Sequence, residues 1–482
     1  MPRTAIGAMP EVLAEFEAAA ERRGLEIDEG FRRAALGVAG AHPLLLITGR
    51  AGTGKSTLIH LLRESVAEHL NVAILAPTGL AAINAGGQTI HSFCRLPPRA
   101  IDPSSIRRLR ERAVFEKLDL VIIDEISMVR ADILDGVDLF LRLNGRHRAL
   151  PFGGVRMVLV GDLFQLSPVV REEERAFFEE QYPSPWFFDA RALQGAQHDV
   201  RQELQLASIE LERVHRQEEI GDLTLLNAVR EGGSPALAAL EEINRRCVPA
   251  WMPDDPEVLE GRVTLTAHIA VAERVNRQRL QALPDRSQLF RGEVTGDLKP
   301  TQERLPAPLD LHLARGAQVL FTRNDPGGRW VNGTLGRIVE LLPQAALVEV
   351  LWGPETGNVH EVGPVTWEQQ TFDYDRAQGR VVSRVVGTYR QLPLVLAWAI
   401  TIHKAQGMTL DRAALDLGRG AFAEGQLYVA LSRCRRLDDL LLLRPIRPSD
   451  LRVSERVRTF GEELRQGVWS RPRQAQLFEG EA

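Results

Sequence analysis

Residues Gly49 to Ser56 match the pattern G-x-x-x-x-G-K-[ST], which holds the phosphates of a nucleoside triphosphate. Lys55 suits the β- and γ-phosphates, and the hydroxyl of Ser56 suits Mg²⁺. Backbone N–H groups at the start of the next helix complete a cradle for the anion. The predicted nucleotide-binding residues are Gly49, Arg50, Ala51, Gly52, Thr53, Gly54, Lys55, Ser56 and Thr57. Kinases, GTPases and motors all carry this loop, so it predicts a bound nucleotide but not the work that hydrolysis drives.

Two acidic residues, Asp124 and Glu125, end the apolar run VIIDE. Such residues commonly just cap a strand, but a phosphate loop upstream gives them a further use. Asp124 is predicted to bind Mg²⁺, and Glu125 to act as base for the attacking water. Another apolar run leads into GDLFQLSPV, which makes Gln165 a candidate to orient that water or to sense the γ-phosphate.

These residues must be held at the ends of strands. Four apolar runs alternate with helical patterns and predict a parallel sheet with helices on both faces; they span 43–49, 72–77, 118–125 and 155–162. A second alternating set spans 263–268, 395–401, 413–418 and 440–445. It is interrupted by short β-rich runs between Gly, Pro, Asn and Asp turns, which predict a small inserted β-barrel.

Composition sets broad limits. A chain of 482 residues, 44% of them hydrophobic, has the length for about three domains. It lacks an apolar run long enough for a membrane span and the layout of a signal peptide. Its three cysteines are too far apart for a C-x-x-C site and indicate reduced thiols in a cytoplasmic protein. The net charge of −5 argues against a basic nucleic-acid coat but allows a local basic channel.

Five segments resemble successive motifs of superfamily-one helicases of the PIF (petite-integration-frequency) type, with RecD-like helicases as the next relatives. The segments are APTGLAAINAGGQTIHSF (76–93), DEISMV (124–129), PFGGVRMVLVGDLFQLSPV (151–169), AWAITIHKAQGMTLD (397–411) and GQLYVALSR (425–433). Their order and spacing run from about residue 43 to 445, nearly the whole chain. The combination is specific, because chance would not produce all five motifs in order.

The resemblance implies an α/β fold of two RecA-like P-loop NTPase domains that close on ATP and Mg²⁺. The implied division is an N-terminal helical segment (1–40), RecA-like domain one (41–203), RecA-like domain two (204–295 and 392–465), a small β-barrel insert (296–391) and a mobile tail (466–482). The arginine-rich stretch 94–112 lies where the family carries a strand-separating wedge, although a solvated loop is the alternative.

The resemblance also implies roles for single residues. Arg216 in ERVHRQ and Arg433 in VALSR would contact the γ-phosphate from domain two, for which the bidentate guanidinium is suited. The residues implied to face DNA are Thr78, Gly79, His91, Thr401, His403 and Lys404. Lys404 is one of only four lysines in an arginine-rich chain, so a compact point charge is expected to matter there.

One family feature is missing. Helicases of this type read adenine with a glutamine upstream of the phosphate loop, but the first glutamine of this chain is Gln88. The equivalent helix offers Asp28, Glu29 or Phe31 instead, so base selectivity is open while the phosphate chemistry is not. The long terminal extensions of some eukaryotic members are also missing, which favours a core enzyme.

The expected function is that of an ATP-dependent DNA helicase moving 5′→3′, a direction that family membership alone implies. Its expected partners are single-stranded DNA and single-strand/duplex junctions, and it is expected to be a monomer in the cytoplasm, at the nucleoid if bacterial. The alternatives are a RecD-like translocase that remodels protein–DNA complexes, a DNA-stimulated ATPase acting as a binding module, and a P-loop phosphotransferase, which has no use for two distant arginines.

The C-terminal stretch RPRQAQLFEGEA is polar except for Leu477 and Phe478. Its QAQLF resembles the short peptide that binds the bacterial sliding clamp, which would recruit the protein to replication or repair sites. The alternative is that the two apolar residues fold back onto the protein's own surface.

Overall fold

The computed structural model describes residues 9–40, 42–67, 69–194, 206–214, 220–248, 259–296 and 305–466. Arg216 and the tail from residue 467 onward lie outside these residues. Within them, no helix combines the length and the apolar character that a membrane crossing requires.

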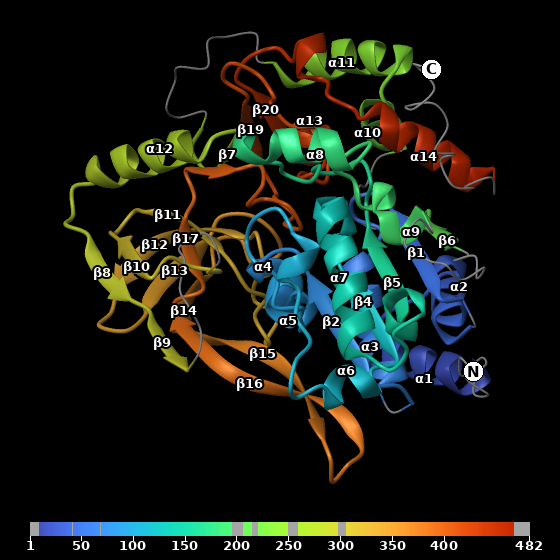
Figure 1. The fold of residues 1–482 in the computed structure, drawn as a ribbon. Coiled ribbons are helices and arrows are strands. Elements are labelled where there is room, and N and C mark those ends of the chain that lie inside the picture. The colour runs from blue at the N-terminus through green and yellow to red at the C-terminus, as the bar shows by residue number, and fades with distance from the viewer. Residues whose placement is uncertain are drawn as a thin grey trace.

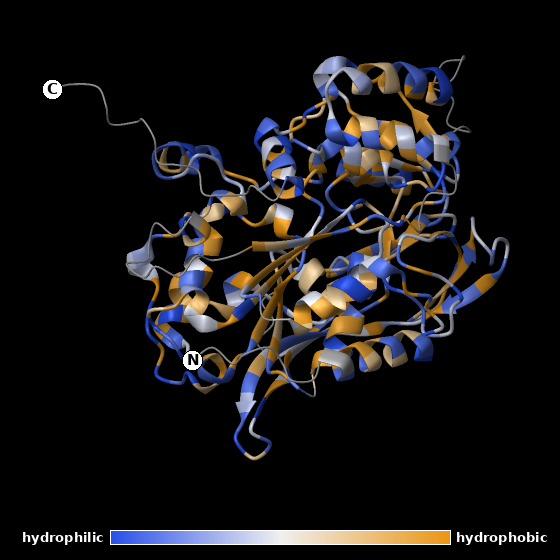
Figure 2. Ribbon diagram, turned by 90° about the vertical axis from the view of Figure 1, so that its right-hand side faces the viewer, coloured by the Kyte–Doolittle hydropathy of each residue, from blue (hydrophilic) through white to orange (hydrophobic). Residues whose placement is uncertain are grey.

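Domain one is built on a sheet of six parallel strands in the order β3-β2-β4-β5-β1-β6 (Figure 1). The strands are β1 (Leu44–Gly49), β2 (Val72–Ala76), β3 (Gln88–Thr89), β4 (Leu120–Ile123), β5 (Arg156–Gly161) and β6 (Leu206–Leu211). Every residue of β1 and β4 is buried, as expected for parallel strands covered on both faces. Figure 2 shows these central strands as mostly hydrophobic.

Helices cover both faces of this sheet. One face carries α1 (Met9–Arg22), α2 (Glu29–Ala39) and α3 (Lys55–Val66), which share a core with the odd residues of β1 and with β5. The other face is covered mainly by α7 (Ala131–Asn144). The shorter helices of the domain are α4 (Gly79–Ala85), α5 (Ile90–Phe93), α6 (Ala113–Lys117), α8 (Arg175–Gln181) and α9 (Arg191–Gln194). The phosphate loop lies between β1 and α3, at the carboxyl edge of the sheet.

Domain two has a second parallel sheet, in the order β18-β7-β19-β20. Its strands are β7 (Val263–Thr266), β18 (Ala399–Thr401), β19 (Ala413–Asp416) and β20 (Leu440–Leu442). Its helices are α10 (Ile220–Glu231), α11 (Ser234–Cys247), α12 (Ile269–Gln281) and α13 (Gln426–Leu431). The predicted α/β class with two RecA-like parallel sheets is confirmed.

The β-rich insert forms three antiparallel sheets: β10-β8, β14-β13-β12-β11-β17 and β15-β16-β9. Their strands are β8 (Gln288–Arg291), β9 (Glu293–Gly296), β10 (Asp310–Leu313), β11 (Gln318–Phe321), β12 (Leu335–Leu341), β13 (Ala346–Val350), β14 (Val359–Val362), β15 (Val365–Asp375), β16 (Arg380–Gln391) and β17 (Leu394–Leu396). The first two sheets share one core that contains Phe290, Leu313 and Phe321. The antiparallel pairing begins at β8, before residue 296, where the insert was expected to start. The sequence did not reveal these first strands because β8 and β9 are short and half-exposed, so their hydrophobic patterns are weak.

The apolar run 395–401 was expected to be one strand of domain two, but the structure divides it. β17 pairs with β11 of the insert, whereas β18 pairs with β7 of domain two. The side chain of Asn276 holds the break: its Nδ2 donates to Leu396 O and Ala399 O, and its Oδ1 accepts from Ala399 N. A hydrophobic run indicates that a strand is buried but not which sheet it joins, so the sequence pattern could not show this division.

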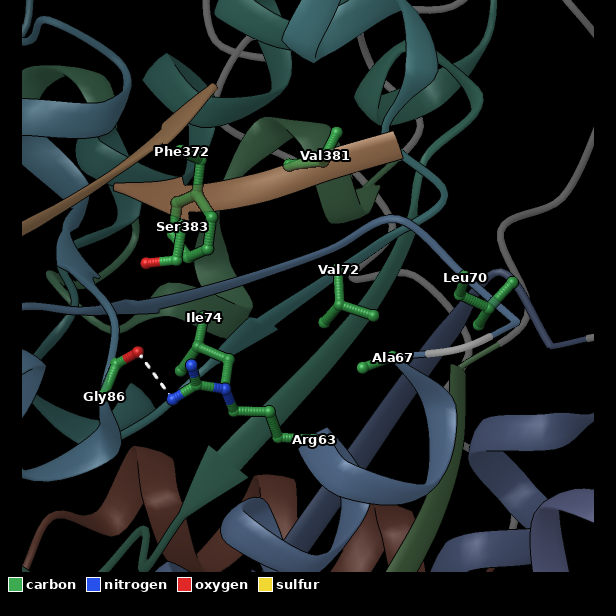
Figure 3. A pocket seen from close by; sticks show the side chains of 9 residues that line it. All are labelled: Arg63, Ala67, Leu70, Val72, Ile74, Gly86, Phe372, Val381 and Ser383. Carbon is green, nitrogen blue, oxygen red and sulfur yellow. Dashed lines mark hydrogen bonds between the residues drawn. The ribbon is translucent and has the colours of Figure 1, made fainter. Parts of the chain in front are cut away.

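The long β15–β16 hairpin reaches back to domain one and passes beside α6 (Figure 1). The Phe372 ring packs edge-on against Phe93 at 5.9 Å, and Val381 N donates to Asn71 Oδ1 at 2.7 Å. Between hairpin and domain one is a cavity of about 130 Å³, into which Arg63 extends while donating to Gly86 O (Figure 3). The insert is therefore in contact with domain one as well as domain two.

The helix α14 (Glu455–Arg465) was expected to close domain two but packs on domain one. Its Phe460 stacks on Phe188 at 4.1 Å, and Arg456 forms an ion pair with the buried Asp189 at 2.6 Å. The amphipathic pattern of this helix predicts a buried face, but not which domain buries it.

Candidate active site at the domain interface

The phosphate loop has the backbone that its glycines permit. Gly52 and Gly54 adopt φ of 84° and 82°, the left-handed region in which a Cβ is unfavourable. A Cβ at Gly49 would stand 2.5 Å from Thr53 Oγ1. Lys55 donates from Nζ to the carbonyls of Gly49 and Arg50 at 2.8 and 2.9 Å, and burial lowers its pKa. An incoming phosphate would therefore find a desolvated ammonium already held by the loop.

Asp124 and Glu125 directly follow β4, at the same carboxyl edge of the sheet as the phosphate loop. Burial raises the pKa of both carboxyls, and the neighbouring charge of Glu125 raises that of Asp124 further. Asp124 Oδ1 accepts from Glu125 N at 2.8 Å, and Glu125 adopts φ of +50°. A positive φ at a residue other than glycine costs about 1–3 kcal/mol and concentrates at functional sites. The strained backbone and the two buried carboxyls make this pair a candidate functional site.

Asp162, directly after β5, contacts Gln165 of its own domain and is joined to domain two by Tyr428 and Arg230. Gln165 Nε2 and Tyr428 OH donate to its Oδ2 at 3.3 and 3.2 Å, and Arg230 of α10 donates to its Oδ1 at 3.1 Å. Burial disfavours the charged form of Asp162, but Arg230 and Lys55 outweigh it, and its pKa lies below the usual value. Tyr428 OH also accepts from Ala51 N at 3.1 Å, so a domain-two side chain touches the phosphate loop itself.

A tight turn of domain two, residues 402–407, brings Gln406 to the predicted catalytic pair. Gln406 Nε2 lies 3.2 Å from Glu125 Oε2 and 3.2 Å from Gln165 Oε1. Arg433, which is 1% exposed, holds the turn by donating from Nη1 to Ala405 O and Met408 O, each at 3.3 Å. Burial raises the pKa of Glu125, and the positive charge of Arg433 opposes that rise.

The residues predicted to face DNA in domain one stand where β2 and β3 end. Thr78 caps α4 by accepting from Ala81 N at 3.2 Å, and Gly79 is the first residue of that helix. His91 lies in α5. In the stretch 94–112, Leu96 and Ile101 are buried against domain one. Of the four arginines in its second half, Arg107, Arg108 and Arg110 are exposed and Arg112 is half-buried.

The matching residues of domain two follow β18. Thr401 Oγ1 accepts from Lys404 N at 3.1 Å, and burial lowers the pKa of Lys404. The rings of His268 and His403 lie nearly parallel to Phe422, with centroids 5.3 and 6.1 Å from it. Phe422 is 53% exposed, so one aromatic ring beside the two histidines is open to solvent.

The structure thus brings Lys55, Asp124, Glu125 and Gln165 together with Arg433, while Arg216 lies outside the described residues. Sequence reasoning missed several polar or aromatic residues at these surfaces: Asp162, Arg230, His268, Gln406, Phe422 and Tyr428. Three of them, Asp162, Gln406 and Tyr428, stand inside quoted motifs, which was a usable signal. Arg230 lies within the helix α10, and His268 ends the apolar run 263–268 just before α12; neither position gave a signal.

Comparison with known proteins adds to this geometry. Residues 36–183 match the model of a family described as PIF1-like helicase. The chain is 30% identical to the ATP-dependent DNA helicase Pif1 of Bdellovibrio bacteriovorus, over 83% of this chain and 84% of that protein. It is 32% identical to human ATP-dependent DNA helicase PIF1 over 88% of this chain, and spans 62% of the human protein's length.

Solved structures of a Pif1 from Bacteroides sp. are similar as well. The unliganded protein is 30% identical and superposes with a TM-score of 0.77, covering 92% of this chain and 97% of that one. The same helicase bound to single-stranded DNA gives a TM-score of 0.62 over 92% of this chain and 98% of that one.

Proposed function

The chain belongs to the PIF1-like helicase family, and from this premise we propose that it is an ATP-dependent DNA helicase that moves 5′→3′ on single-stranded DNA and unwinds the duplex ahead. The observation that carries this proposal is the pair of contacts from Gln406 to Glu125 and Gln165. The turn that bears Gln406 also bears His403 and Lys404, residues expected to face DNA. One short segment of domain two therefore links the DNA side to the hydrolysis site, which a motor requires.

The residues fit ATP together with Mg²⁺. Ser56 and Asp124 would hold the ion, leaving positions for phosphate oxygens and water, which Mg²⁺ tends to keep. A buried carboxylate with a raised pKa is costly to ionise alone, and a neighbouring dication favours its charged form. The bound ion would neutralise charge on the phosphates.

The reaction needs few groups from the protein. Lys55 and the loop amides would bind the β- and γ-phosphates, Glu125 would take the proton of the attacking water, and Gln165 would orient that water. Arg433, together with Arg216, would stabilise charge on the transferred phosphoryl group from domain two. The ion pair between Arg230 of domain two and Asp162 of domain one would stabilise the closed arrangement of the two domains.

Single-stranded DNA would cross the carboxyl edges of both sheets. Its contacts would come from Thr78, Gly79 and His91 in domain one, and from Thr401, His403 and Lys404 in domain two. Phe422 with His268 adds an exposed aromatic surface on which a base can stack, a contact worth about 1–3 kcal/mol per base and indifferent to sequence. The arginine-rich stretch 94–112 would act as the wedge at the junction.

A strand-displacement assay tests the proposal. ATP should drive many rounds of unwinding of a tailed duplex, and ATP hydrolysis should rise when single-stranded DNA is added. Tight DNA binding with hydrolysis but without unwinding would favour the binding module, and displacement of bound proteins without unwinding would favour the translocase.

Base selectivity should be weak. Asp28 is occupied in capping α2, accepting from Phe31 N at 2.9 Å, and Phe31 is buried against Phe16. Neither can offer the adenine edge the paired donor and acceptor of a glutamine amide. We expect kcat/KM values for ATP and GTP within about tenfold, since a site without specific hydrogen bonds discriminates poorly. A preference for ATP of several hundredfold in a steady-state comparison would show that another group reads the base.

DNA binding should weaken at alkaline pH because of Lys404. Burial lowers the pKa of its ammonium in the free protein, whereas a DNA phosphate stabilises the charged form. At a pH below this lowered pKa, Lys404 is charged in both the free and the DNA-bound protein. At a higher pH the free protein must take up a proton in order to bind DNA, so the affinity for DNA falls as the pH rises. In Lys404→Arg the guanidinium stays charged, and this decline should disappear. Anisotropy titrations of single-stranded DNA at constant ionic strength measure it; parallel pH profiles for the two proteins would refute the assignment.

The tail beyond residue 466 is proposed to bind the sliding clamp through Leu477 and Phe478. These residues lie outside the described part of the chain, so the proposal rests on the likeness of QAQLF to clamp-binding peptides. An isolated tail peptide should bind the clamp, and its Leu477→Ala/Phe478→Ala version should not. Equal binding by both peptides, or none by either, removes the idea. A monomer working in the cytoplasm, at the nucleoid if the source is bacterial, completes the proposal.

A further inference from the structure

The amide of Gln406 lies between the two groups that are expected to handle the attacking water. We propose that Gln406 is a positioning residue that restrains hydrolysis until single-stranded DNA binds, an inference that rests on the DNA-stimulated ATPase proposed above. Its Nε2 is 3.2 Å from Glu125 Oε2 and 3.2 Å from Gln165 Oε1. An amide NH₂ has two hydrogens, so it can donate to both oxygens at once.

This contact competes with the chemistry. A base accepts the proton of the attacking water through its carboxylate oxygen, and that water must also meet Gln165. While the Gln406 amide donates to Glu125 Oε2 and Gln165 Oε1, a water must displace it to use the same acceptors. A hydrogen bond from an uncharged amide also stabilises the carboxylate and makes it a weaker base; Gln406 indeed opposes the burial that raises the pKa of Glu125.

The same turn is connected to the DNA side by short hydrogen bonds. Ala405 N donates to Thr401 O at 3.0 Å, Lys404 N to Thr401 Oγ1 at 3.1 Å, and Gln406 N to His403 O at 3.2 Å. A phosphate that draws Lys404 or His403 toward DNA must therefore move Gln406 with it. The guanidinium of Arg433 holds the carbonyls on both sides of Gln406, so this residue would move in step with the turn.

Removing the amide should release the restraint without DNA. We expect Gln406→Ala to raise the DNA-free kcat for ATP at least about threefold, the equivalent of one net hydrogen bond, with KM for ATP little changed. The ratio of DNA-stimulated to DNA-free rate should fall by the same factor. The affinity for single-stranded DNA should stay within about twofold, because the substitution leaves His403 and Lys404 in place.

Two further variants sharpen the test. Gln406→Asn keeps the amide but shortens it by one methylene, so it cannot reach both oxygens and should give an intermediate rate. Gln281→Ala, at the exposed end of α12, is the matched control and should behave as the wild-type chain. Circular dichroism and thermal unfolding of each variant exclude a folding defect as the cause.

The outcomes separate the two proposals. If Gln406→Ala is folded and its ATPase rate without DNA is unchanged or lowered, Gln406 does not restrain hydrolysis. If the ATPase rate falls both with and without DNA, Gln406 instead assists the attacking water. If single-stranded DNA does not change the ATPase rate of the wild-type chain, both the proposed function and the release of the restraint by DNA are wrong. The restraint itself is tested separately, by the rate of Gln406→Ala without DNA.

Discussion

Glu125→Gln should abolish DNA-stimulated ATP hydrolysis while leaving nucleotide binding intact. The substitution is isosteric, and its amide oxygen can still accept from Gln406, so the local structure should persist. A glutamine cannot take a proton at neutral pH, and loss of a general base costs about 10²- to 10⁴-fold in rate. Steady-state ATPase assays with saturating single-stranded DNA measure the rate, and titration with a fluorescent nucleotide measures binding.

Glu180→Gln is the control for this prediction, because Glu180 is an exposed residue of α8. It should hydrolyse ATP at the wild-type rate. If Glu125→Gln also stays within about threefold of wild type, less than the contribution expected of any general base, then Glu125 is not the base.

Lys55→Ala should act on binding and turnover alike. The Lys55 ammonium is buried and held by two loop carbonyls, so its charge is desolvated at the position of the β- and γ-phosphates. Removing one partner of a charge-assisted hydrogen bond costs about 1.5–3 kcal/mol, which predicts nucleotide affinity weaker by about 10- to 100-fold. Isothermal titration with ATP and Mg²⁺ gives Kd, and the same samples give kcat.

The matched control is Lys117→Ala, since Lys117 is exposed and remote from the loop, near the Tyr374 ring of the hairpin. It should bind nucleotide as the wild-type chain does. Together, Lys55→Ala and Glu125→Gln separate binding from chemistry; an unchanged Kd in Lys55→Ala would contradict the assignment of the phosphate loop.

Much of the fold is legible in the sequence because buried parallel strands are continuous apolar runs. β1, β4 and β5 fall where those runs predict, and the loop and the Asp124–Glu125 pair stand at their carboxyl ends. This edge is where ligands bind in α/β sheets, so the strand positions alone place the nucleotide.

Other parts depend on contacts between residues far apart in the chain. The ion pair of Arg230 with Asp162, and the hydrogen bond of Tyr428 to Ala51, join residues that no local pattern relates. The same reason explains why the division of 395–401 and the packing of α14 on domain one were not predicted. A period of two or 3.6 residues reveals a buried face but not the partner that covers it.

The residues that the sequence motifs left unexplained are the ones that connect the domains. Gln406 and Tyr428 stand in motifs selected for their likeness to helicases, yet their targets, Glu125 and Ala51, became visible only in the folded chain. Interfaces between domains are built from such pairs, which is why the positions of Lys55, Asp124 and Glu125 at strand ends of the first domain were predictable and the side chains of the second domain that contact this site were not.

Duplexes that differ only in their single-stranded tail show whether this protein is a motor that travels 5′→3′ and separates DNA strands. The wild-type chain, ATP and Mg²⁺ are mixed with equal duplexes bearing a 5′ tail, a 3′ tail or none, in DNA and RNA versions of the tail, and the displaced strand is measured over time. We expect rapid unwinding of the duplex with the 5′ DNA tail and little unwinding of a duplex with a 3′ tail or with no tail. Unwinding from the 3′ tail, or hydrolysis of ATP with no strand displaced from any duplex, would contradict it.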